Sequence, residues 1–231
     1  MAVTSPPARR FDNRVAVVTG GGGGLGSAIC LALAREGARV AVIDAQLPLA
    51  QATVERMPDD SGLACHADVR DLAQVREAVN AAAAKWGRVD ALVATAGGSL
   101  GTPRDIEDIT EDDWDLVLDV NVKGTYNSAI ACVPHMRTVG SGAIVTFSSI
   151  GGRTNSPVTG VPYAAAKAGI LGLTRRLARE VGPDGIRVNA IAPGLFLTDR
   201  LQGMFDNMAP EEQQEVIESI PLRRMPTIDE C

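Results

Sequence analysis

The sequence predicts an α/β fold in which helices cover both faces of a doubly wound parallel sheet. Short apolar runs rich in β-branched residues alternate along the chain with stretches of helical periodicity. A glycine-rich segment separates the first apolar run from the first helical stretch. The length of 231 residues and the hydrophobic content of 45% suit one domain with a complete core.

Six strands are expected at the apolar runs, with helices between them. The runs are residues 15–19, 40–44, 63–67, 91–94, 143–147 and 187–191. The helical stretches are residues 24–36, 47–57, 71–86, 111–136 and 163–181. Because crossovers between parallel strands are right-handed, we expect the strand order 3-2-1-4-5-6, with a ligand beyond the carboxyl ends of the strands.

The segment Thr-Gly-Gly-Gly-Gly-Gly-Leu-Gly at 19–26 has the composition of a phosphate-binding turn. It lies between a strand and an amphipathic helix, as in the first half of a Rossmann-like dinucleotide-binding unit. Its glycines let backbone amides approach a pyrophosphate, whose charge the helix N-terminus favours. The run fits two spacings, either Gly21, Gly23 and Gly26 or Gly20, Gly24 and Gly26.

Asp44 ends the second predicted strand, about 20 residues beyond the glycine turn. An acid at this distance accepts hydrogen bonds from an adenosine ribose and repels a 2′-phosphate. The glycine turn contains no Lys or Arg that could neutralise such a phosphate. Both observations favour NAD over NADP, although an aspartate here can also form a turn or cap a helix.

Tyr163 and Lys167 stand four residues apart on a predicted helix, so their side chains share one face. An ammonium group beside a phenol favours the phenolate and lowers the pKa of the tyrosine. A tyrosine tuned in this way can exchange a proton with an alcohol or carbonyl oxygen. The pair alone occurs often by chance, and the glycine turn in the same chain is what makes it informative.

The bulk composition excludes several classes of protein. The net charge of −6 gives no basic surface for nucleic acid, and no apolar stretch is long enough to span a membrane. The four cysteines form no Cys-x-x-Cys, which favours free thiols in the cytoplasm. With only two histidines, no metal site is expected. Residues 1–10 are expected to form a flexible tail, and residues 11–231 a single domain.

Several motifs together resemble the short-chain dehydrogenase/reductase family in its single-domain form. They are the segments at 19–26, 68–69, 96–97, 121–124, 148–149, 163–167 and 187–194. The resemblance implies a hydride transfer between NAD and a secondary alcohol or ketone. It also implies a small-molecule substrate and a homodimer or homotetramer, for which the apolar helix starting at Tyr163 is a candidate face.

The resemblance implies four catalytic residues. Tyr163 would be the general acid/base, and Lys167 would bind the nicotinamide ribose and lower the tyrosine pKa. Ser149 would hold the substrate oxygen near Tyr163, although Ser148 could take that place. Asn121 would anchor a water in a proton relay, or it could merely bond backbone in a helix.

The resemblance also implies a cofactor-binding set spread over the carboxyl ends of the strands. Asp68 and Val69 would contact the adenine, although Asp68 could instead cap the helix that starts near Asp71. The full set is Gly20, Gly24, Leu25, Gly26, Asp44, Asp68, Val69, Ala96, Gly97, Tyr163, Lys167, Pro193, Gly194 and Thr198. The substrate candidates are Ser149, Arg153, Tyr163 and Leu195, and residues 195–220 are expected to form a lid.

The chain departs from the family pattern in two places. Thr95 stands where an asparagine is usual, and we expect local repacking there rather than loss of chemistry. The chain also ends before the segment that would supply a seventh strand, which weakens the expectation of a tetramer. Two other functions fit the motifs: a 3-oxoacyl-carrier-protein reductase, and a non-catalytic dinucleotide-binding protein on the same scaffold.

Overall fold

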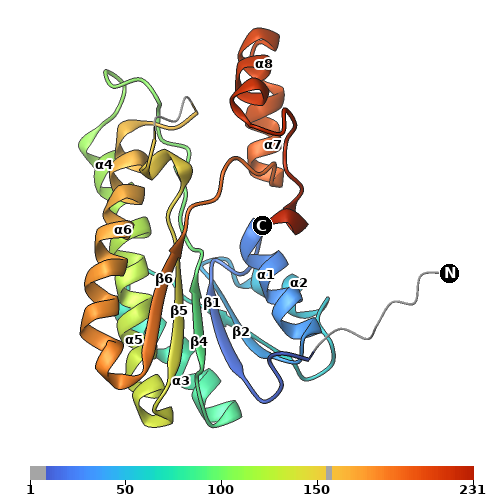
Figure 1. Cartoon of the computed structure of the whole chain (residues 1–231), viewed down its shortest axis with the longest axis vertical. Coiled ribbons are helices and arrows are strands. Elements are labelled where there is room, and N and C mark those ends of the chain that lie inside the picture. Colours follow the sequence, from blue (N-terminus) through green and yellow to red (C-terminus); the bar gives the residue numbers. More distant parts are fainter. Residues whose placement is uncertain (1–8, 155–157) are drawn as a thin grey trace, which may run out of the picture.

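The protein contains a six-stranded parallel sheet (Figure 1). The structure is a computed structural model that describes residues 9–154 and 158–231. The side chains of residues 199–201 and 204 are not described. The strand order is β3-β2-β1-β4-β5-β6, which confirms the predicted order. The strands are β1 (Val15–Thr19), β2 (Arg39–Asp44), β3 (Gly62–His66), β4 (Ala91–Ala94), β5 (Gly142–Phe147) and β6 (Ile186–Ile191). The order reverses between β1 and β4, where a doubly wound sheet opens a crevice for a ligand.

Helices cover both faces of the sheet because alternate strand residues point in opposite directions. Val17 and Ile43 pack toward α3 (Leu72–Trp86) and α5 (Gly124–Val139), the layer to which α6 (Val161–Val181) also belongs. Val18 and Val42 pack toward α1 (Gly24–Arg35) and α2 (Leu47–Val54) on the opposite face. In Figure 1, α5 and α6 lie on one side of the sheet, and α1 and α2 lie on the other.

Local signals in the sequence fix the ends of several helices. Asp71 caps α3 by accepting hydrogen bonds from the backbone N–H of Ala73 and Gln74, and Gly87 ends this helix in the left-handed region. The cap on α3 is therefore Asp71, and the alternative cap role for Asp68 is wrong. Thr110 and Asp113 form a capping box at the start of α4 (Glu111–Leu118).

The single helix predicted over residues 111–136 is interrupted. The π-helical turn η1 (Asp119–Lys123) separates α4 from α5, and α5 continues to Val139 with Pro134 inside it. A wide turn adds one residue to the helix, and the periodicity of a long helical stretch does not show where that residue is inserted. Asn121, which is fully buried, lies within this turn.

The last part of the chain lies beyond the carboxyl ends of the strands (Figure 1). After β6 the chain forms α7 (Asp199–Asp206) and α8 (Pro210–Ser219), so the proposed lid segment is helical. The short η4 (Ile228–Glu230) then returns to α1. Residues 1–8 of the predicted N-terminal tail lie outside the described residues, whereas Arg10 pairs with Glu36 at the end of α1.

Candidate active site

The glycine turn joins β1 to α1 at the centre of the sheet, next to the crevice. Gly20 and Gly24 have φ angles of +69° and +52°, which favour glycine. A Cβ atom added at Gly26 would overlap the carbonyl oxygen of Gly20. A Cβ atom added at Gly23 would meet nothing within 4 Å. The backbone therefore matches the spacing of Gly20, Gly24 and Gly26 rather than the spacing that requires Gly23.

Asp44 ends β2 beside the glycine turn. Its carboxylate accepts hydrogen bonds from the backbone N–H of Gly22 at 3.0 Å and of Gln46 at 2.9 Å. The two bonds hold the carboxylate beside the glycine turn, partly exposed. Neither Lys nor Arg occurs in residues 15–34, which contain the glycine turn, or in residues 40–55, which contain Asp44. The carboxylate of Asp44 therefore has no cation from these two segments beside it.

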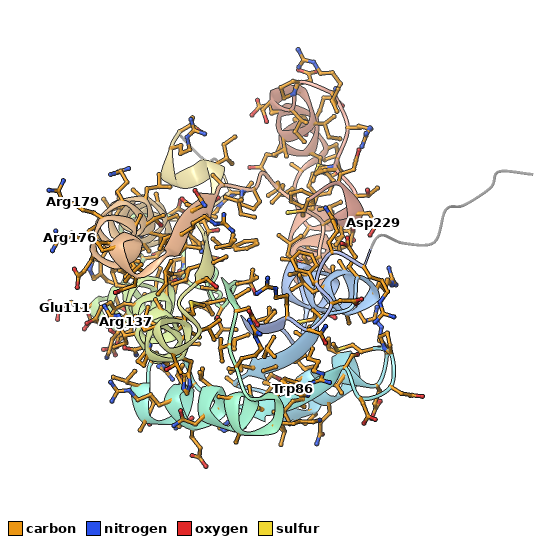
Figure 2. All side chains as sticks on the ribbon, turned by 60° about the horizontal axis from the view of Figure 1, so that its bottom comes forward. Trp86, Glu111, Arg137, Arg176, Arg179 and Asp229 are labelled. Carbon is orange, nitrogen blue, oxygen red and sulfur yellow. The ribbon has the colours of Figure 1, made fainter. Side chains whose placement is uncertain are left out.

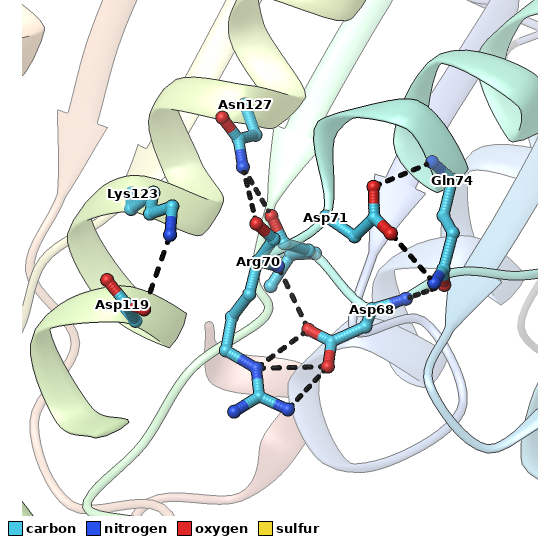
Figure 3. A network of polar contacts seen from close by, with 8 residues as sticks. Asp68, Arg70, Asp71, Gln74, Asp119, Lys123 and Asn127 are labelled. Atoms are coloured by element: carbon cyan, nitrogen blue, oxygen red, sulfur yellow. Dashed lines mark hydrogen bonds and ion pairs between the residues drawn. The ribbon is translucent and has the colours of Figure 1, made fainter. Parts of the chain in front are cut away.

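A polar network fixes the segment that follows β3 (Figure 3). Asp68 accepts hydrogen bonds from the backbone N–H of Arg70 and from its guanidinium group, which reaches the carboxylate at 2.6 Å. These bonds hold the pKa of the Asp68 carboxyl below its ordinary value. The buried amide of Asn127 on α5 donates to the carbonyl oxygens of Val69 and Arg70.

The segment after β4 runs between the glycine turn and the π-helical turn. Thr95 donates a hydrogen bond to the carbonyl oxygen of Thr19 at 2.6 Å, so its hydroxyl ties β4 to the start of the glycine turn. Ala96 lies against Gly20, because a Cβ atom added at Gly20 would meet the Ala96 backbone at 2.7 Å. Thr95 thus provides a link between strands at the position where the sequence departs from the family pattern.

Asn121 bridges the π-helical turn and the loop after β4. Its amide donates to the carbonyl oxygens of Gly98 and Val117, both at 2.9 Å, and its Oδ1 accepts from the Gly98 N–H at 3.0 Å. The sequence left open whether this amide bonds only backbone, and these side-chain bonds are all to backbone groups. The main-chain carbonyl oxygen of Asn121 also accepts a hydrogen bond, from the Thr125 hydroxyl at 2.6 Å.

The two serines after β5 point to different partners. Ser148 is buried and donates to the carbonyl oxygen of Lys167 at 2.7 Å, so it joins β5 to α6. Ser149 is only partly buried, and its Oγ accepts from the Gly151 N–H at 3.1 Å at the start of η2 (Ile150–Gly152). Of the two serines, only Ser149 is partly exposed.

Tyr163 and Lys167 lie on consecutive turns of α6, as the spacing predicts. Lys167 is buried, its Nζ donates to the carbonyl oxygen of Phe147 at 2.8 Å, and it lies 5.6 Å from the centre of the Tyr163 ring. A Cβ atom added at Gly97 would come within 3.3 Å of this Nζ and would overlap the Asn121 side chain. The fold therefore gathers Gly97, Asn121 and Lys167 in one place, although they are far apart in the sequence.

The remaining predicted residues follow β6 and η2. The carbonyl oxygen of Pro193 accepts from the Ile150 N–H at 3.0 Å, which joins the loop after β6 to η2. A Cβ atom at Gly24 would meet the Thr198 side chain at 3.0 Å, so Thr198 lies over the glycine turn. Gly194 and Leu195 lie between these two contacts in the chain, whereas Arg153 is exposed at the end of η2.

Three residues that position the site were not identified from the sequence. Ser148 was considered only as a substrate contact, yet it binds the backbone at Lys167. Arg70 and Asn127 were not considered, yet they hold the segment that contains Asp68 and Val69. The spacing of Asp68 and Arg70 was a usable signal, because an aspartate often accepts from the backbone two residues on.

No group of three or more His, Cys, Asp or Glu side chains in residues 9–154 and 158–231 is arranged to hold a metal ion. No helix in that part of the chain is long and apolar enough to cross a membrane.

Comparisons with known proteins point to one family. Residues 14–209 match the family model described as short chain dehydrogenase. A probable galactose dehydrogenase from Rhizobium meliloti is 40% identical, over 97% of this chain and 88% of that protein. Levodione reductase from Leifsonia aquatica is 39% identical, over 94% of this chain and 82% of that protein.

Solved structures give the same result. The crystal structure of a levodione reductase superposes with a TM-score of 0.88 and 36% identity, over 96% of this chain and 88% of that chain. The structure of an NAD⁺-bound xylitol dehydrogenase superposes with a TM-score of 0.85 and 28% identity, over 96% and 90% of the two chains.

Proposed function

The chain belongs to the short-chain dehydrogenase family, and from this premise we propose that it transfers hydride between NAD and a secondary alcohol or ketone. It is an oxidoreductase that uses a nicotinamide dinucleotide, as its family does. The single observation that supports NAD over NADP is the Asp44 carboxylate, which is held at the rim of the crevice by the N–H groups of Gly22 and Gln46.

The residues at the carboxyl ends of the strands fit a dinucleotide. The turn at Gly20, Gly24 and Gly26 has the backbone that a pyrophosphate requires, because side chains there would be strained or would overlap backbone. Asp44 would hold the adenosine ribose, and Asp68 and Val69 the adenine. The remaining contacts would come from Leu25, Ala96, Gly97, Tyr163, Lys167, Pro193, Gly194 and Thr198.

Four side chains of this protein would carry out the proton transfer and position the groups that take part in it. When bound, the nicotinamide ring accepts or supplies the hydride. Tyr163 would take the proton from the alcohol oxygen or return it to the carbonyl oxygen. Lys167, held by the carbonyl oxygen of Phe147, would place a positive charge beside the Tyr163 ring. Ser149 would position the substrate oxygen, and Asn121 would anchor a water that leads to Lys167 in a proton relay.

The substrate class follows from the family and its relatives. Proteins similar to this chain are named galactose dehydrogenase, xylitol dehydrogenase and levodione reductase. We propose a small secondary alcohol or ketone that lies beside Ser149 and Tyr163, with Leu195 and the exposed Arg153 as further contacts. The segment 195–220, which includes α7 and α8, would close over it as a lid.

The two other functions are less well supported. A 3-oxoacyl-carrier-protein reductase usually prefers NADPH, whose 2′-phosphate the Asp44 carboxylate would repel. A non-catalytic binding protein would not need Lys167 buried beside Tyr163, since an unused buried ammonium group costs stability. We therefore propose that the protein is an oxidoreductase of secondary alcohols and ketones rather than either alternative.

An assay of reduced-cofactor formation with a panel of polyols and cyclic secondary alcohols tests the proposal. We expect NAD-dependent oxidation of at least one panel member, and the reverse reduction of the matching ketone with NADH. Turnover that occurs only with NADPH and an acyl thioester would instead support the 3-oxoacyl-carrier-protein reductase.

Asp44→Ala is expected to weaken NADH binding about tenfold or more, because hydrogen bonds from ribose hydroxyls to a carboxylate are lost. NADPH binding should weaken less or improve, because the repulsion of its 2′-phosphate is removed. Dissociation constants of both nucleotides, measured by fluorescence titration, check this. Asp184→Ala, at a surface carboxylate paired with Arg137, is the control. Unchanged constants for both nucleotides in the Asp44 variant would remove Asp44 from the ribose site.

We also propose that two copies pair through the outer surface of α4 and α6. Ile106, Trp114 and Val161 are 68%, 41% and 49% exposed, and they line a groove of about 300 Å³ where the two helices begin. The first turn of α4 is acidic from Glu111 on, whereas Arg176 and Arg179 lie near the far end of α6. In Figure 2, Glu111, Arg176 and Arg179 project from the same side of the molecule. A two-fold axis across α6 would bring the acidic end of one copy to the basic end of the other.

Trp114→Glu is expected to convert the assembly to monomers, because a carboxylate would be buried within the pairing surface. Sedimentation velocity should then give half the particle mass of the unchanged dimer. Leu222→Glu is the control, since Leu222 is 73% exposed and lies in the C-terminal segment, away from this surface. Equal masses for the two variants would contradict pairing through α4 and α6.

We propose the cytoplasm as the location of the protein. All four cysteines are free, and burial raises the pKa of the Cys30 and Cys132 thiols to about 12, so these two are poor nucleophiles. Unpaired thiols of this kind are typical of a reducing compartment.

A further inference from the structure

The Asp68 carboxylate is held by a side chain that the proposed function does not use. The Arg70 guanidinium donates to it through Nε, at 2.9 Å and 3.1 Å from the two oxygens, and through Nη2 at 2.6 Å (Figure 3). The two side chains are 45% and 30% exposed, for Arg70 and Asp68 respectively. An ion pair this exposed contributes little to the stability of the fold. Stability therefore does not explain why the guanidinium makes three hydrogen bonds to one carboxylate.

The backbone around Asp68 is anchored without the Arg70 guanidinium. Asn127 donates to the carbonyl oxygens of Val69 and Arg70, and the Gln74 side chain accepts from the Asp68 N–H at 3.0 Å. Gln74 is in turn held by Asp71, the cap of α3. Removal of the guanidinium would therefore leave the chain in place, and the carboxylate would keep only its hydrogen bond from the Arg70 backbone N–H at 2.9 Å.

The Arg70 guanidinium fixes the orientation of the Asp68 carboxylate. An aspartate at the end of a strand can rotate about two side-chain torsions, and each orientation presents different lone pairs. A planar guanidinium that binds both oxygens removes this freedom. Three N–H groups of Arg70 donate to the carboxylate, and the Nε–H is shared between its two oxygens. A carboxylate has about four lone-pair sites, so one acceptor remains.

Nearby charges allow this arrangement to persist. The Asp119 carboxylate on η1 also attracts Arg70 and is itself paired with Lys123 at 3.3 Å. In Figure 3, Asp119 and Lys123 are paired on the helix next to Arg70. Because Asp119 already has this partner, its attraction leaves the guanidinium on the Asp68 carboxylate.

We propose that Arg70 is a positioning residue that aims the Asp68 carboxylate at the 6-amino group of adenine, and thereby makes the protein discriminate adenine from hypoxanthine. The inference rests on the proposed dinucleotide function. A fixed carboxylate accepts a hydrogen bond from an amino group, whereas the 6-oxo group of hypoxanthine offers it only a second acceptor. Without Arg70, the carboxylate can turn away from either base, and the difference between the bases shrinks.

The test compares the dissociation constants of NADH and of reduced nicotinamide hypoxanthine dinucleotide, measured by fluorescence on the whole chain. For the unchanged protein we expect about tenfold or tighter binding of NADH. In Arg70→Ala this ratio should fall to about threefold or less. Asp68→Asn should lower it equally, and the double variant should lower it no further, because the two residues act as one unit.

Arg137→Ala is the matched control. Arg137 pairs with Asp184 at 2.7 Å with exposed fractions of 52% and 34%, close to those of the Arg70–Asp68 pair. It lies at the end of α5, beside η3 (Gly182–Asp184) at the amino end of β6. This variant should keep the ratio of the unchanged protein, and both arginine variants should have similar melting temperatures.

The outcomes separate this inference from the proposed function. Failure of the unchanged protein to bind either nucleotide would refute both. NADH binding with the unchanged ratio in Arg70→Ala would refute the role of Arg70 and leave the proposed function intact. A larger ratio in Arg70→Ala would also overturn the inference, because it would mean that the guanidinium serves the 6-oxo group of hypoxanthine.

Discussion

Tyr163→Phe is expected to lower kcat for alcohol oxidation by about 10²- to 10⁴-fold, the usual contribution of a general acid/base. The substitution removes one hydroxyl and keeps the ring, which lies 5.6 Å from Lys167 Nζ. Nucleotide binding and the folded state should therefore change little. Steady-state kinetics with the best substrate of the alcohol panel, together with an NADH titration, measure both quantities.

The chain offers a matched control for this variant. Tyr126 is the only other tyrosine, and it is 50% exposed on the outer surface of α5. Tyr126→Phe removes the same hydroxyl at a position away from the crevice, and kcat should stay within about twofold of the unchanged value. If Tyr163→Phe retained full activity, the assignment of Tyr163 as the acid/base would be wrong.

Gly26→Ala is expected to have the largest effect on stability. Its Cβ atom would overlap the carbonyl oxygen of Gly20 and would lie 2.7 Å from the Thr95 hydroxyl oxygen. Because the obstacle is backbone on a tight turn, the first turn of α1 must move away from β1. Overpacking of this kind costs about 1–3 kcal/mol and occasionally more. Thermal and urea unfolding should show the loss, together with weak or absent NADH binding.

Gly23→Ala separates this steric effect from the general loss of a glycine. Gly23 belongs to the same turn, has an extended backbone with φ of −156°, and has space for a Cβ atom. Its free energy of unfolding should change by less than about 1 kcal/mol, or rise slightly, because alanine restricts the unfolded chain. Equal destabilisation by both variants would contradict the glycine spacing that the backbone indicates.

The sheet could be predicted from the sequence because each of its strands and helices is marked by a pattern of neighbouring residues. Each buried strand is a short β-branched run and each helix has its own periodicity. The strand order is the one usual for a sheet whose first crossover carries a dinucleotide-binding glycine turn. The glycine spacing could not be settled in this way. Five consecutive glycines are chemically identical, and the two registers are distinguished by the positive φ angles of Gly20 and Gly24 and by the open space at Gly23.

The candidate site was predicted only in part for a similar reason. Its residue types and order could be read from the motifs, but their contacts arise between distant segments. Ser148 and Ser149 are adjacent and identical, and the bond from Ser148 to the Lys167 backbone is what tells them apart. The bonds from Asn121 to Gly98 depend on a π-helical turn, whose position the residue pattern does not predict. The pairing of Arg70 with Asp68 could not be predicted, because a charged side chain in a loop is usually exposed to solvent.

The central claim is that this chain is an oxidoreductase whose cofactor site selects NAD through Asp44. Fluorescence titration of the whole 231-residue protein with NADH and with NADPH tests it most directly. We predict that NADH binds about tenfold or more tightly than NADPH, because only NADH offers two ribose hydroxyls to the Asp44 carboxylate. Equal binding of the two nucleotides, or tighter binding of NADPH, would contradict this account of the site.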